Sequence, residues 1–469
     1  MGLMPTPPWF FWLLWLAVSL WGLTYLLRWR RASSSQQHPG GQQRLRRVLL
    51  PQDIVYGLVA LFVLAWTVYY LPPVYSRVFW RLDFLRARIR LSLSPVGGVP
   101  TPVAQGTLRY QTPTPTATFT PQPSATATPT LASTPTPTLT PSPTPSPTPV
   151  PPSVILQPPP RWERQTANNC GPATLTMYLN WWGWEGDQED IAQRIRPNPK
   201  DKNVNVEELV FFVRNYAGWL NVEYRVGGTV ELLKRIIASG LPVMIEWGIY
   251  LERAYWPNDD RWAGHFLLLT GYDDTRGVFI AQDSLRGLNQ EYTYEEVDAQ
   301  WKTFNRVFIV VYHPRFEETV KSVLGPYWDM DTSRQIALEQ ARAEIEANPE
   351  DAFAWFNLGT NLVYFEKWHE AAKAYDKARE LGLPQRFLRY QFGPFFAYFH
   401  SWRLEDLQAL IEYALKITPV SEEVWVWRGW LYYRLGDREE AIRSFRKAYE
   451  LNPTFPDAQY ALRQLGVTP

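Results

Sequence analysis

The stretch Gln165-Thr-Ala-Asn-Asn-Cys170-Gly-Pro-Ala173 contains the only cysteine of the 469 residues and places it where a helix is expected to begin. Two asparagines, which often cap helices, precede the cysteine, and Pro172 suits a first helical turn. The free N–H groups and the macrodipole of a helix N-terminus favour a thiolate over a thiol. The stretch therefore predicts a nucleophilic cysteine, and the alternative is a buried structural thiol.

A second segment, residues 264–284, has the pattern of a β-hairpin, because two apolar runs flank a turn-forming stretch at 273–277. A hairpin that turns about Asp274 places His265 directly opposite Asp283. Opposed Cβ atoms in a hairpin are about 5 Å apart. At that separation a carboxylate can hold an imidazole in one tautomer. We therefore predict that Asp283, and not an acid within the turn, orients His265.

A cysteine followed by a histidine and a carboxylate supplies what nucleophilic thiol chemistry requires. In this interpretation His265 takes the thiol proton and Asp283 stabilises the imidazolium, while Cys170 attacks a carbonyl carbon and forms an acyl-enzyme. The resulting oxyanion needs hydrogen-bond donors. The backbone N–H of Cys170 and the side-chain amide of Gln165 are the expected donors.

These residues resemble the papain-like cysteine peptidases of family 39, whose best-known members remove leader peptides after a double glycine during bacteriocin export. The resemblance covers about residues 153–314 and implies an α+β papain-like fold, a catalytic triad of Cys170, His265 and Asp283, and Gln165 as the oxyanion residue. Neither a phosphate-binding loop nor a multi-span export domain follows, so leader removal is not expected to carry over. The domain looks like the stand-alone branch. The resemblance rests on Gln165, Cys170-Gly-Pro-Ala173, Gly264-His-Phe266, Gly271-Tyr-Asp273 and Asp283-Ser284.

An aromatic loop leads directly to His265. Loops that adjoin a catalytic residue often line the substrate cleft, so Tyr255, Trp256 and Trp262 are candidate substrate-binding residues. The alternative is that these aromatic side chains pack beneath an irregular loop.

Two apolar runs near the N-terminus, residues 9–27 and 54–74, are each long enough to span a bilayer as a helix. We therefore expect a membrane anchor over residues 1–90, with the lipid bilayer as a partner. Six arginines between the runs indicate a cytoplasmic loop, which places the later domains outside the cytoplasm. Five arginines that follow the second run keep the opposite orientation open.

Residues 91–152 are expected to form a disordered linker rich in Pro, Thr and Ser. Alternation of Thr-Pro and Ser-Pro favours an extended, polyproline-like spacer. Its composition suits O-glycosylation outside a cell, and an unmodified tether is the alternative.

Prolines recur downstream at positions 349, 384, 419 and 453. Tryptophan, glycine, alanine and aromatic residues at fixed places between them resemble tetratricopeptide repeats. We therefore expect residues 331–469 to form an all-α repeat domain whose middle unit is degenerate. Such arrays bind peptide or protein segments, so a protein partner or the substrate is expected to dock there.

The charge is balanced, with 47 basic and 46 acidic residues, and gives no electrostatic reason to expect nucleic-acid binding. One cysteine and five scattered histidines provide no ligand pair at zinc spacing, and no metal or other cofactor is expected. The predicted fold class is an α+β papain-like domain plus an all-α tetratricopeptide repeat domain, preceded by two transmembrane helices. The predicted function is that of a bacterial-type, membrane-anchored cysteine peptidase. A non-catalytic surface receptor with the same fold, and an acyl transferase or amidase with the same triad, are the alternatives.

Overall fold

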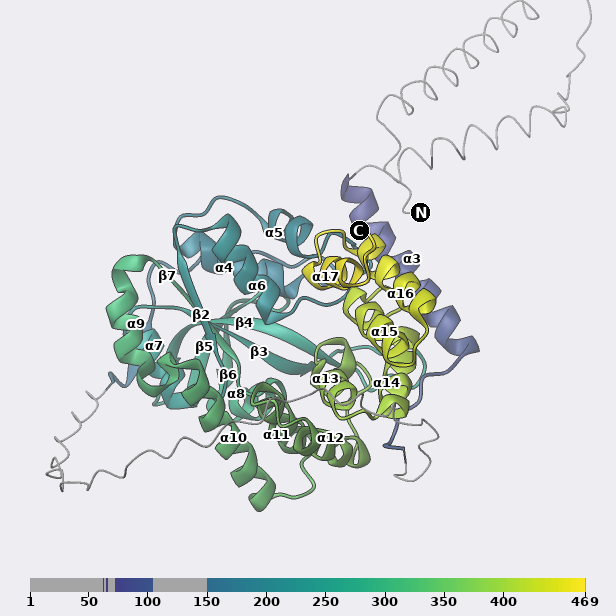
Figure 1. Cartoon of the computed structure of the whole chain (residues 1–469). Helices are drawn as coiled ribbons and strands as arrows, with labels where there is room; N and C mark the ends of the chain where they lie inside the picture. The colour runs from purple at the N-terminus through teal and green to yellow at the C-terminus, as the bar shows by residue number, and fades with distance from the viewer. Residues whose placement is uncertain (1–61, 63–64, 66–71, 104–149, 469) are drawn as a thin grey trace, which may run out of the picture.

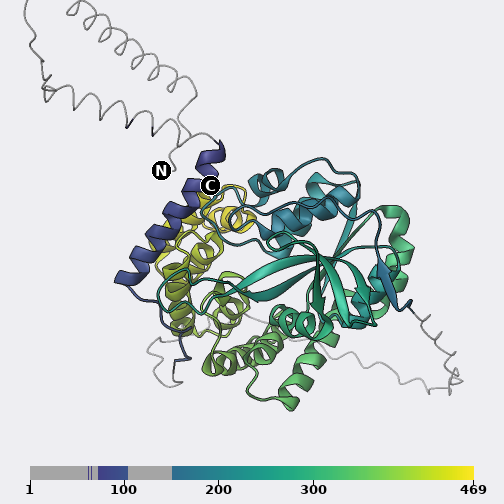
Figure 2. The same cartoon turned by 180° about the vertical axis from the view of Figure 1, so that it is seen from behind.

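The computed structural model describes residues 72–103 and 150–468, together with positions 62 and 65 (Figure 1). Within these residues a mixed α+β domain is followed by an array of helices. Helix α3 (Pro72–Leu93) reaches the array at residues 417–420, where Arg90 donates a hydrogen bond to the Ile417 carbonyl oxygen at 3.5 Å (Figure 1 and Figure 2). It also contacts the α+β domain, since Asp83 pairs with Lys202 at 2.9 Å.

Seven strands of the described residues form one antiparallel sheet with the order β2-β7-β3-β4-β5-β6, and β1 pairs with β4. The central strands β3, β4 and β7 are buried along nearly their whole length. They are therefore apolar on both faces, unlike a sheet with one wet face. The strands are β1 (Ser153–Ile155), β2 (Asn221–Arg225), β3 (Val243–Tyr250), β4 (Trp262–Asp273), β5 (Val278–Asp283), β6 (Gly287–Thr293) and β7 (Phe308–Tyr312).

Helices cover both faces of the sheet, which explains the burial of the central strands. Phe266 and Val311 belong to one apolar core with α4, α5 and α6, whereas their neighbours Leu267 and Val310 belong to a second core with α7, α8 and α9. This alternation follows the two-residue period of a strand. The helices are α4 (Cys170–Trp181), α5 (Gln188–Ile195), α6 (Val206–Tyr216), α7 (Val230–Ala238), α8 (Tyr294–Trp301) and α9 (Glu317–Leu324).

The C-terminal helices pack as successive pairs, as the proline period predicts. Gly359 and Gly429 occupy equivalent places in two of the pairs, where an added Cβ would lie 2.7 Å from the Tyr375 ring and closer still to the Phe445 ring. The two helices of each pair approach this closely because glycine has no side chain. The helices are α10 (Met330–Ala347), α11 (Ala352–Tyr364), α12 (Trp368–Leu381), α13 (Gly393–His400), α14 (Leu404–Ile417), α15 (Glu422–Arg434), α16 (Arg438–Leu451) and α17 (Pro456–Gln464).

The structure corrects the predicted fold class at its N-terminal end. Within the described residues no helix is both long and apolar enough to cross a membrane. The first predicted span, 9–27, and most of the second, 54–74, lie outside the described residues. Residues 72–74 begin α3, which carries five arginines in its 22 residues and is not a spanning helix. The α+β domain and the all-α array of helices agree with the predicted fold class, and the extracytoplasmic location stays a prediction.

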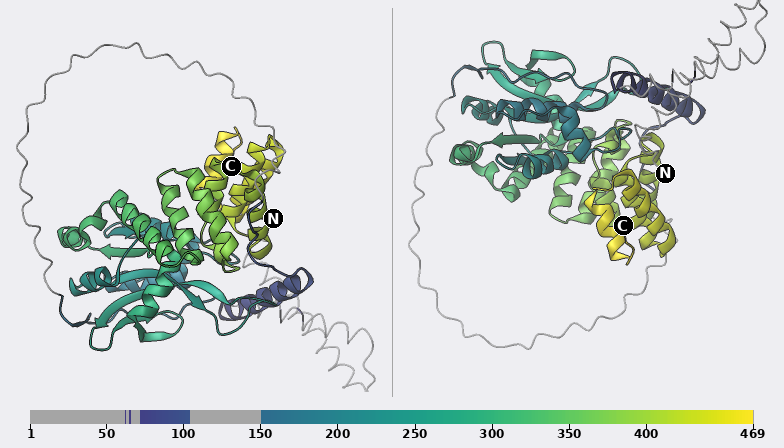
Figure 3. Two further views of the ribbon diagram at one scale, coloured as in Figure 1. Left: turned by 90° about the horizontal axis from the view of Figure 1, so that it is seen from below. Right: turned by 90° about the horizontal axis from the view of Figure 1, so that it is seen from above.

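The predicted linker also begins too early. Residues 94–103, called the docked segment below, pack against the repeat helices. Arg379 donates hydrogen bonds to the backbone oxygens of Pro100 and Thr101 at 2.7 and 2.9 Å, and Asp406 accepts one from the N–H of Val103 at 3.0 Å. The docked segment is ordered because the repeats satisfy its backbone groups up to its last residue, Val103. The views from below and above show the array of helices next to the α+β domain (Figure 3). Residues 104–149 of the predicted linker lie outside the described residues.

Candidate active site

Cys170 is the first residue of α4 and is half-buried. The loop before it is held by Asn169, whose side chain donates to Gln188 at 2.9 Å and accepts from Arg196 at 3.0 Å. Asn169 occupies the N-cap position but makes no capping hydrogen bond with its side chain. The prediction of an asparagine at the N-cap is therefore confirmed, but its side chain does not cap the helix and instead fixes the loop that presents Cys170.

His265 lies on β4 and Asp283 at the end of β5, and both side chains are buried. His265 Nε2 and Asp283 Oδ1 are 2.9 Å apart. The hairpin does not turn about Asp274 in the simple register that the sequence suggests, because Leu268 pairs with Gln282. His265 and Asp283 are therefore diagonal neighbours and not the directly opposed pair that we predicted.

Several donors hold the Asp283 carboxylate in its charged form. Tyr292 donates its hydroxyl to Oδ2 at 2.5 Å, and the backbone N–H groups of Leu285 and Arg286 donate to Oδ1 at 2.7 and 3.1 Å. Burial disfavours the charge, but the hydrogen bonds from His265, Tyr292 and Leu285 outweigh it and hold the pKa of Asp283 well below its usual range. Asp283 is thus a fixed anion behind the imidazole.

The protonation of His265 reflects two opposing effects. Burial favours the neutral imidazole, but hydrogen bonds with Asp283 and with Cys170 on the other side of the ring outweigh it and raise the pKa to about 9. Since Nε2 faces Asp283, Nδ1 is the nitrogen left for the thiol. Near neutral pH the arrangement can hold an imidazolium between two acidic groups.

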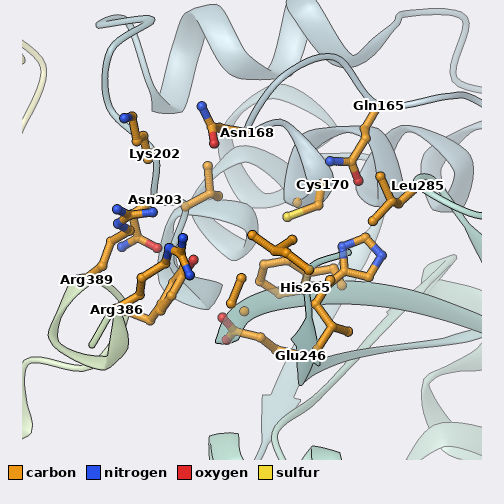
Figure 4. A pocket seen from close by; sticks show the side chains of 18 of the residues that line it. Gln165, Asn168, Cys170, Lys202, Asn203, Glu246, His265, Leu285, Arg386 and Arg389 are labelled. Atoms are coloured by element: carbon orange, nitrogen blue, oxygen red, sulfur yellow. The ribbon is translucent and has the colours of Figure 1, made fainter. Parts of the chain in front are cut away.

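Gln165 lies on the loop beside Cys170, with its side chain tied to Ser284. The Ser284 hydroxyl donates to Gln165 Oε1 at 2.9 Å, and the Gln165 N–H donates to the Ser284 carbonyl at 2.9 Å. Because its oxygen is engaged, the amide turns its NH₂ group toward Cys170, as Figure 4 shows. A donor at this place can meet an oxyanion formed at the carbon that Cys170 attacks.

Gln165, Cys170 and His265 line one pocket, but the three candidate substrate-binding residues divide. Tyr255 lines this pocket. Trp256 and Trp262 are only 2% and 1% exposed. Trp256 lies beneath the Arg386 guanidinium at 4.2 Å, and Trp262 stacks on Phe304 with ring centroids 5.7 Å apart. The two tryptophans pack beneath the loop, which is the alternative stated above for the aromatic side chains.

The sequence missed the residues that the repeats contribute to the pocket. Arg386, Arg389 and Tyr390 line it from the degenerate middle unit. Arg386 forms an ion pair of 2.5 Å with Asp259 on the loop that leads to His265. One indication of this contact is present in the sequence, the poor match of the middle unit to the repeat pattern. Such a mismatch indicates that residues of the unit make contacts other than those between repeats.

Glu246 is a second missed residue. It lies on β3, lines the same pocket and is 6% exposed. A single acid within the apolar strand 241–247 was the available signal. Within the described residues, no group of three or more His, Cys, Asp or Glu side chains is arranged to hold a metal ion.

Comparison with known proteins identifies two regions of the chain. Residues 155–309 match the family model described as the Peptidase_C39 like family, and residues 422–455 match the tetratricopeptide repeat model. A search of curated proteins found no match.

Solved structures resemble separate parts of the chain. A double glycine motif protease from an AMS/PCAT transporter, crystallised with the leader peptide, is 17% identical; the match covers 34% of this chain and 97% of that one, with a TM-score of 0.25. Xylellain, a cysteine protease from Xylella fastidiosa, is 15% identical over 35% of this chain and 86% of its own, with a TM-score of 0.27. A thermophilic tetratricopeptide repeat protein from Thermus thermophilus is 20% identical over 32% and 78%, with a TM-score of 0.25.

Proposed function

We propose that the Peptidase_C39-like domain of this chain, which residues 155–309 form, is a cysteine peptidase that hydrolyses peptide bonds in peptide or protein substrates. The observation that carries the proposal is the position of His265, which hydrogen-bonds Asp283 at 2.9 Å and also contacts Cys170. A thiol, an imidazole and a carboxylate in that order supply a nucleophile, a proton carrier and a group that orients the carrier.

In the acylation step Cys170 Sγ forms a bond to the substrate carbonyl carbon, and the carbonyl oxygen becomes an oxyanion. The Cys170 N–H and the Gln165 side-chain amide donate hydrogen bonds to this oxygen. The C–N bond then breaks, and the leaving amine takes the proton from His265. The product of this step is a thioester between Cys170 and the N-terminal part of the substrate.

Deacylation reverses these roles with water as the nucleophile. His265 takes a proton from the water as its oxygen attacks the thioester carbon, and it returns that proton to Cys170 as the C–S bond breaks. Asp283 stays ionised throughout, since its task is to orient and stabilise the imidazolium.

The repeat array is proposed to act in substrate or partner binding. Its middle unit contributes Arg386, Arg389 and Tyr390 to the pocket, so a bound substrate would touch the repeats as well as the peptidase domain. The docked segment already covers part of α12 and α14. A protein partner is therefore proposed to use the remaining faces of the array.

The test is alkylation of the full chain with limiting iodoacetamide from pH 4 to 9, together with hydrolysis of a mixed peptide library read by mass spectrometry. Cys170 is the only thiol, so the alkylation rate reports its thiolate alone. We expect rapid alkylation of the wild type below pH 8, slow alkylation of His265→Ala, and peptide cleavage that Cys170→Ala abolishes. A Cys170 that titrates alike in both proteins, with no peptide cleaved, would refute the proposal and favour a binding module.

A further inference from the structure

Glu246 is an acidic side chain inside the pocket that the proposed mechanism does not use. It lies on β3, paired in the sheet with Phe266 of β4, and it lines the same pocket as Cys170 and His265. Figure 4 shows it on the strand side of the pocket, across from the helix that presents Cys170. Glu246 is thus placed to contact whatever the pocket binds.

The Glu246 carboxyl group is buried without compensation. Its residue is 6% exposed, and within the described part of the chain its side chain makes no hydrogen bond or ion pair. Burial first, and then the charges of Cys170 and Glu207, raise the pKa of Glu246 well above its usual range. Both neighbours are acidic groups, and within the described residues no lysine, arginine or histidine forms an ion pair with Glu246. Buried acids are normally paired, and an unpaired one in a pocket calls for a partner from outside.

Part of the pocket that Glu246 lines is apolar, and Phe266, its partner in the sheet, belongs to that part. Val204, Ile249 and Phe266 line the pocket together with Glu246. A long aliphatic chain that ends in a cation fits such a site, because its methylene groups cover apolar surface while its charged end meets the carboxylate. Lysine and arginine side chains have this form.

The cations of the same pocket already have partners or lie elsewhere. Lys202 pairs with Asp83 at 2.9 Å, and Arg386 pairs with Asp259 at 2.5 Å. Arg389 is held by the Thr418 hydroxyl at 3.1 Å. None of the three forms an ion pair with Glu246 in the described residues, so the acid is not the internal counter-ion of this group.

From the burial of Glu246, its lack of a partner and the apolar part of the pocket, we propose that Glu246 selects peptide substrates with a lysine or arginine side chain close to the scissile bond. This inference rests on the proposed peptidase function and names its substrate class. A substrate with a neutral isostere of lysine leaves the buried carboxyl group without a partner. The free-energy cost of that unpaired group disfavours the neutral substrate and makes the pocket selective.

The test uses the full chain and a peptide library cleaved by the wild type, with the residues on both sides of each cleaved bond read by mass spectrometry. The best sequence is then remade with lysine, norleucine or glutamate at the selected position. Norleucine matches the lysine stem without the charge. We expect kcat/KM for the lysine peptide to exceed that for norleucine by about tenfold or more, the usual scale of a charge-assisted contact. In Glu246→Gln we expect this ratio to fall to about one.

Glu207→Gln is the matched control, because Glu207 acts on Glu246 electrostatically but does not line the pocket. It should keep the preference for lysine. A melting temperature of Glu246→Gln close to that of the wild type shows that the variant is folded, and retention of the preference by a folded Glu246→Gln would overturn the inference. Cleavage by the wild type without any preference for lysine or arginine would overturn the proposed role of Glu246 but not the proposed peptidase function. Failure to cleave any peptide would overturn both.

Discussion

His265 and Asp283 lie on the same face of the sheet because a β-bulge leaves one residue of β4, Thr270, without a partner on β5 between His265 and the turn. Nearer the turn Tyr272 pairs with Phe279, but beyond Thr270 the register shifts and Leu268 pairs with Gln282. Without the shift Asp283 would pair with Leu268, and His265, three residues further along, would point to the other face. The β-bulge therefore brings the acid to the imidazole.

Deletion of Thr270 should leave most of the activity intact. It removes the unpaired residue, so that Gly271 and Leu269 follow each other opposite Ile280 and Ala281, and His265 stays diagonal to Asp283 on the same face. Peptide hydrolysis and the iodoacetamide profile of Cys170 are the measurements, and the profile should stay close to that of the wild type.

Thr270→Ala is the control for this deletion. It removes the hydrogen bond that the Gln282 side chain donates to the Thr270 hydroxyl at 3.0 Å but keeps the extra residue. It should retain most of the activity, at the expense of about 1 kcal/mol of stability. A folded but inactive deletion variant, beside an active Thr270→Ala, would show that the bend of the bulge, and not the pairing of β4 with β5 alone, sets the orientation of His265.

The stability that the His265–Asp283 contact contributes should depend on pH. The pKa of His265 rises from 6.5 to about 9 on folding, so the imidazolium stabilises the folded state in full below pH 6.5, and this contribution is lost as the pH rises through about 9. A shift of one pKa unit corresponds to about 1.4 kcal/mol, so the rise of the His265 pKa contributes about 3 kcal/mol to the free energy of unfolding. The free energy of unfolding of Asp283→Asn should therefore fall furthest below the wild type near pH 6, and the gap should shrink toward pH 10.

Urea unfolding of both proteins between pH 6 and 10 measures this gap. Asp273→Asn is a suitable control, because Asp273 ends β4 beside the turn, away from His265, and pairs with Arg276 on the surface. Its difference from the wild type should change little over the same range. A gap for Asp283→Asn that stayed constant from pH 6 to 10 would mean that His265 is not protonated in the folded protein.

Gln165→Ala should lower kcat without a comparable change in KM. Loss of one oxyanion donor typically costs about 10²- to 10³-fold in kcat, since the oxygen becomes negative only in the transition state. Ser284→Ala should lower kcat less, because Ser284 only orients the Gln165 amide. Steady-state kinetics of both variants with one peptide make the comparison. An equal loss in the two variants would assign the effect to loop structure and not to the amide.

The site residues that the sequence predicts lie in local elements, a helix start and a hairpin. The site residues that it misses reach the pocket through contacts between parts of the chain that are far apart in the sequence. Cys170 was found because helix signals surround it, and His265 with Asp283 because a hairpin is a local structure. The predicted register was wrong by two residues. Asp273 pairs with Val278, so the turn is centred beyond Asp274, and the bulge at Thr270 then takes one residue of β4 out of the pairing. Arg386 reaches the pocket through contacts between domains, which no local pattern encodes.

The same limit applies to the N-terminal region and to the two buried tryptophans. Residues 94–103 read as the start of a spacer because they are rich in proline and glycine, but their order depends on Arg379 and Asp406, about 300 residues away in the sequence. Trp256 is buried because Arg386 covers it. Composition predicts the conformation of a segment in isolation. The order of residues 94–103 and the burial of Trp256 instead depend on residues that are far away in the sequence.

The ion pair between Arg386 and Asp259 should be the strongest single link between the repeats and the loop that leads to His265. Their side chains are 2% and 0% exposed, and Arg386 also donates to the Trp262 carbonyl at 2.8 Å. Arg386→Met leaves Asp259 as an uncompensated buried charge, which typically costs about 3 to 5 kcal/mol. Urea unfolding should show this loss, whereas Arg443→Met, at an exposed pair on α16, should change stability by about 0.5 kcal/mol or less.

Arg386→Lys separates charge from shape at the same position. Lysine keeps the positive charge but lacks the planar fork that reaches Asp259 and the Trp262 carbonyl together, and it stacks less well on Trp256. We therefore expect it to recover only part of the stability that Arg386→Met loses. Full recovery of stability by Arg386→Lys would mean that the positive charge alone, and not the shape of the guanidinium, stabilises this contact. If Arg386→Met unfolded at the same urea concentration as Arg443→Met, the repeats would not hold this wall of the pocket.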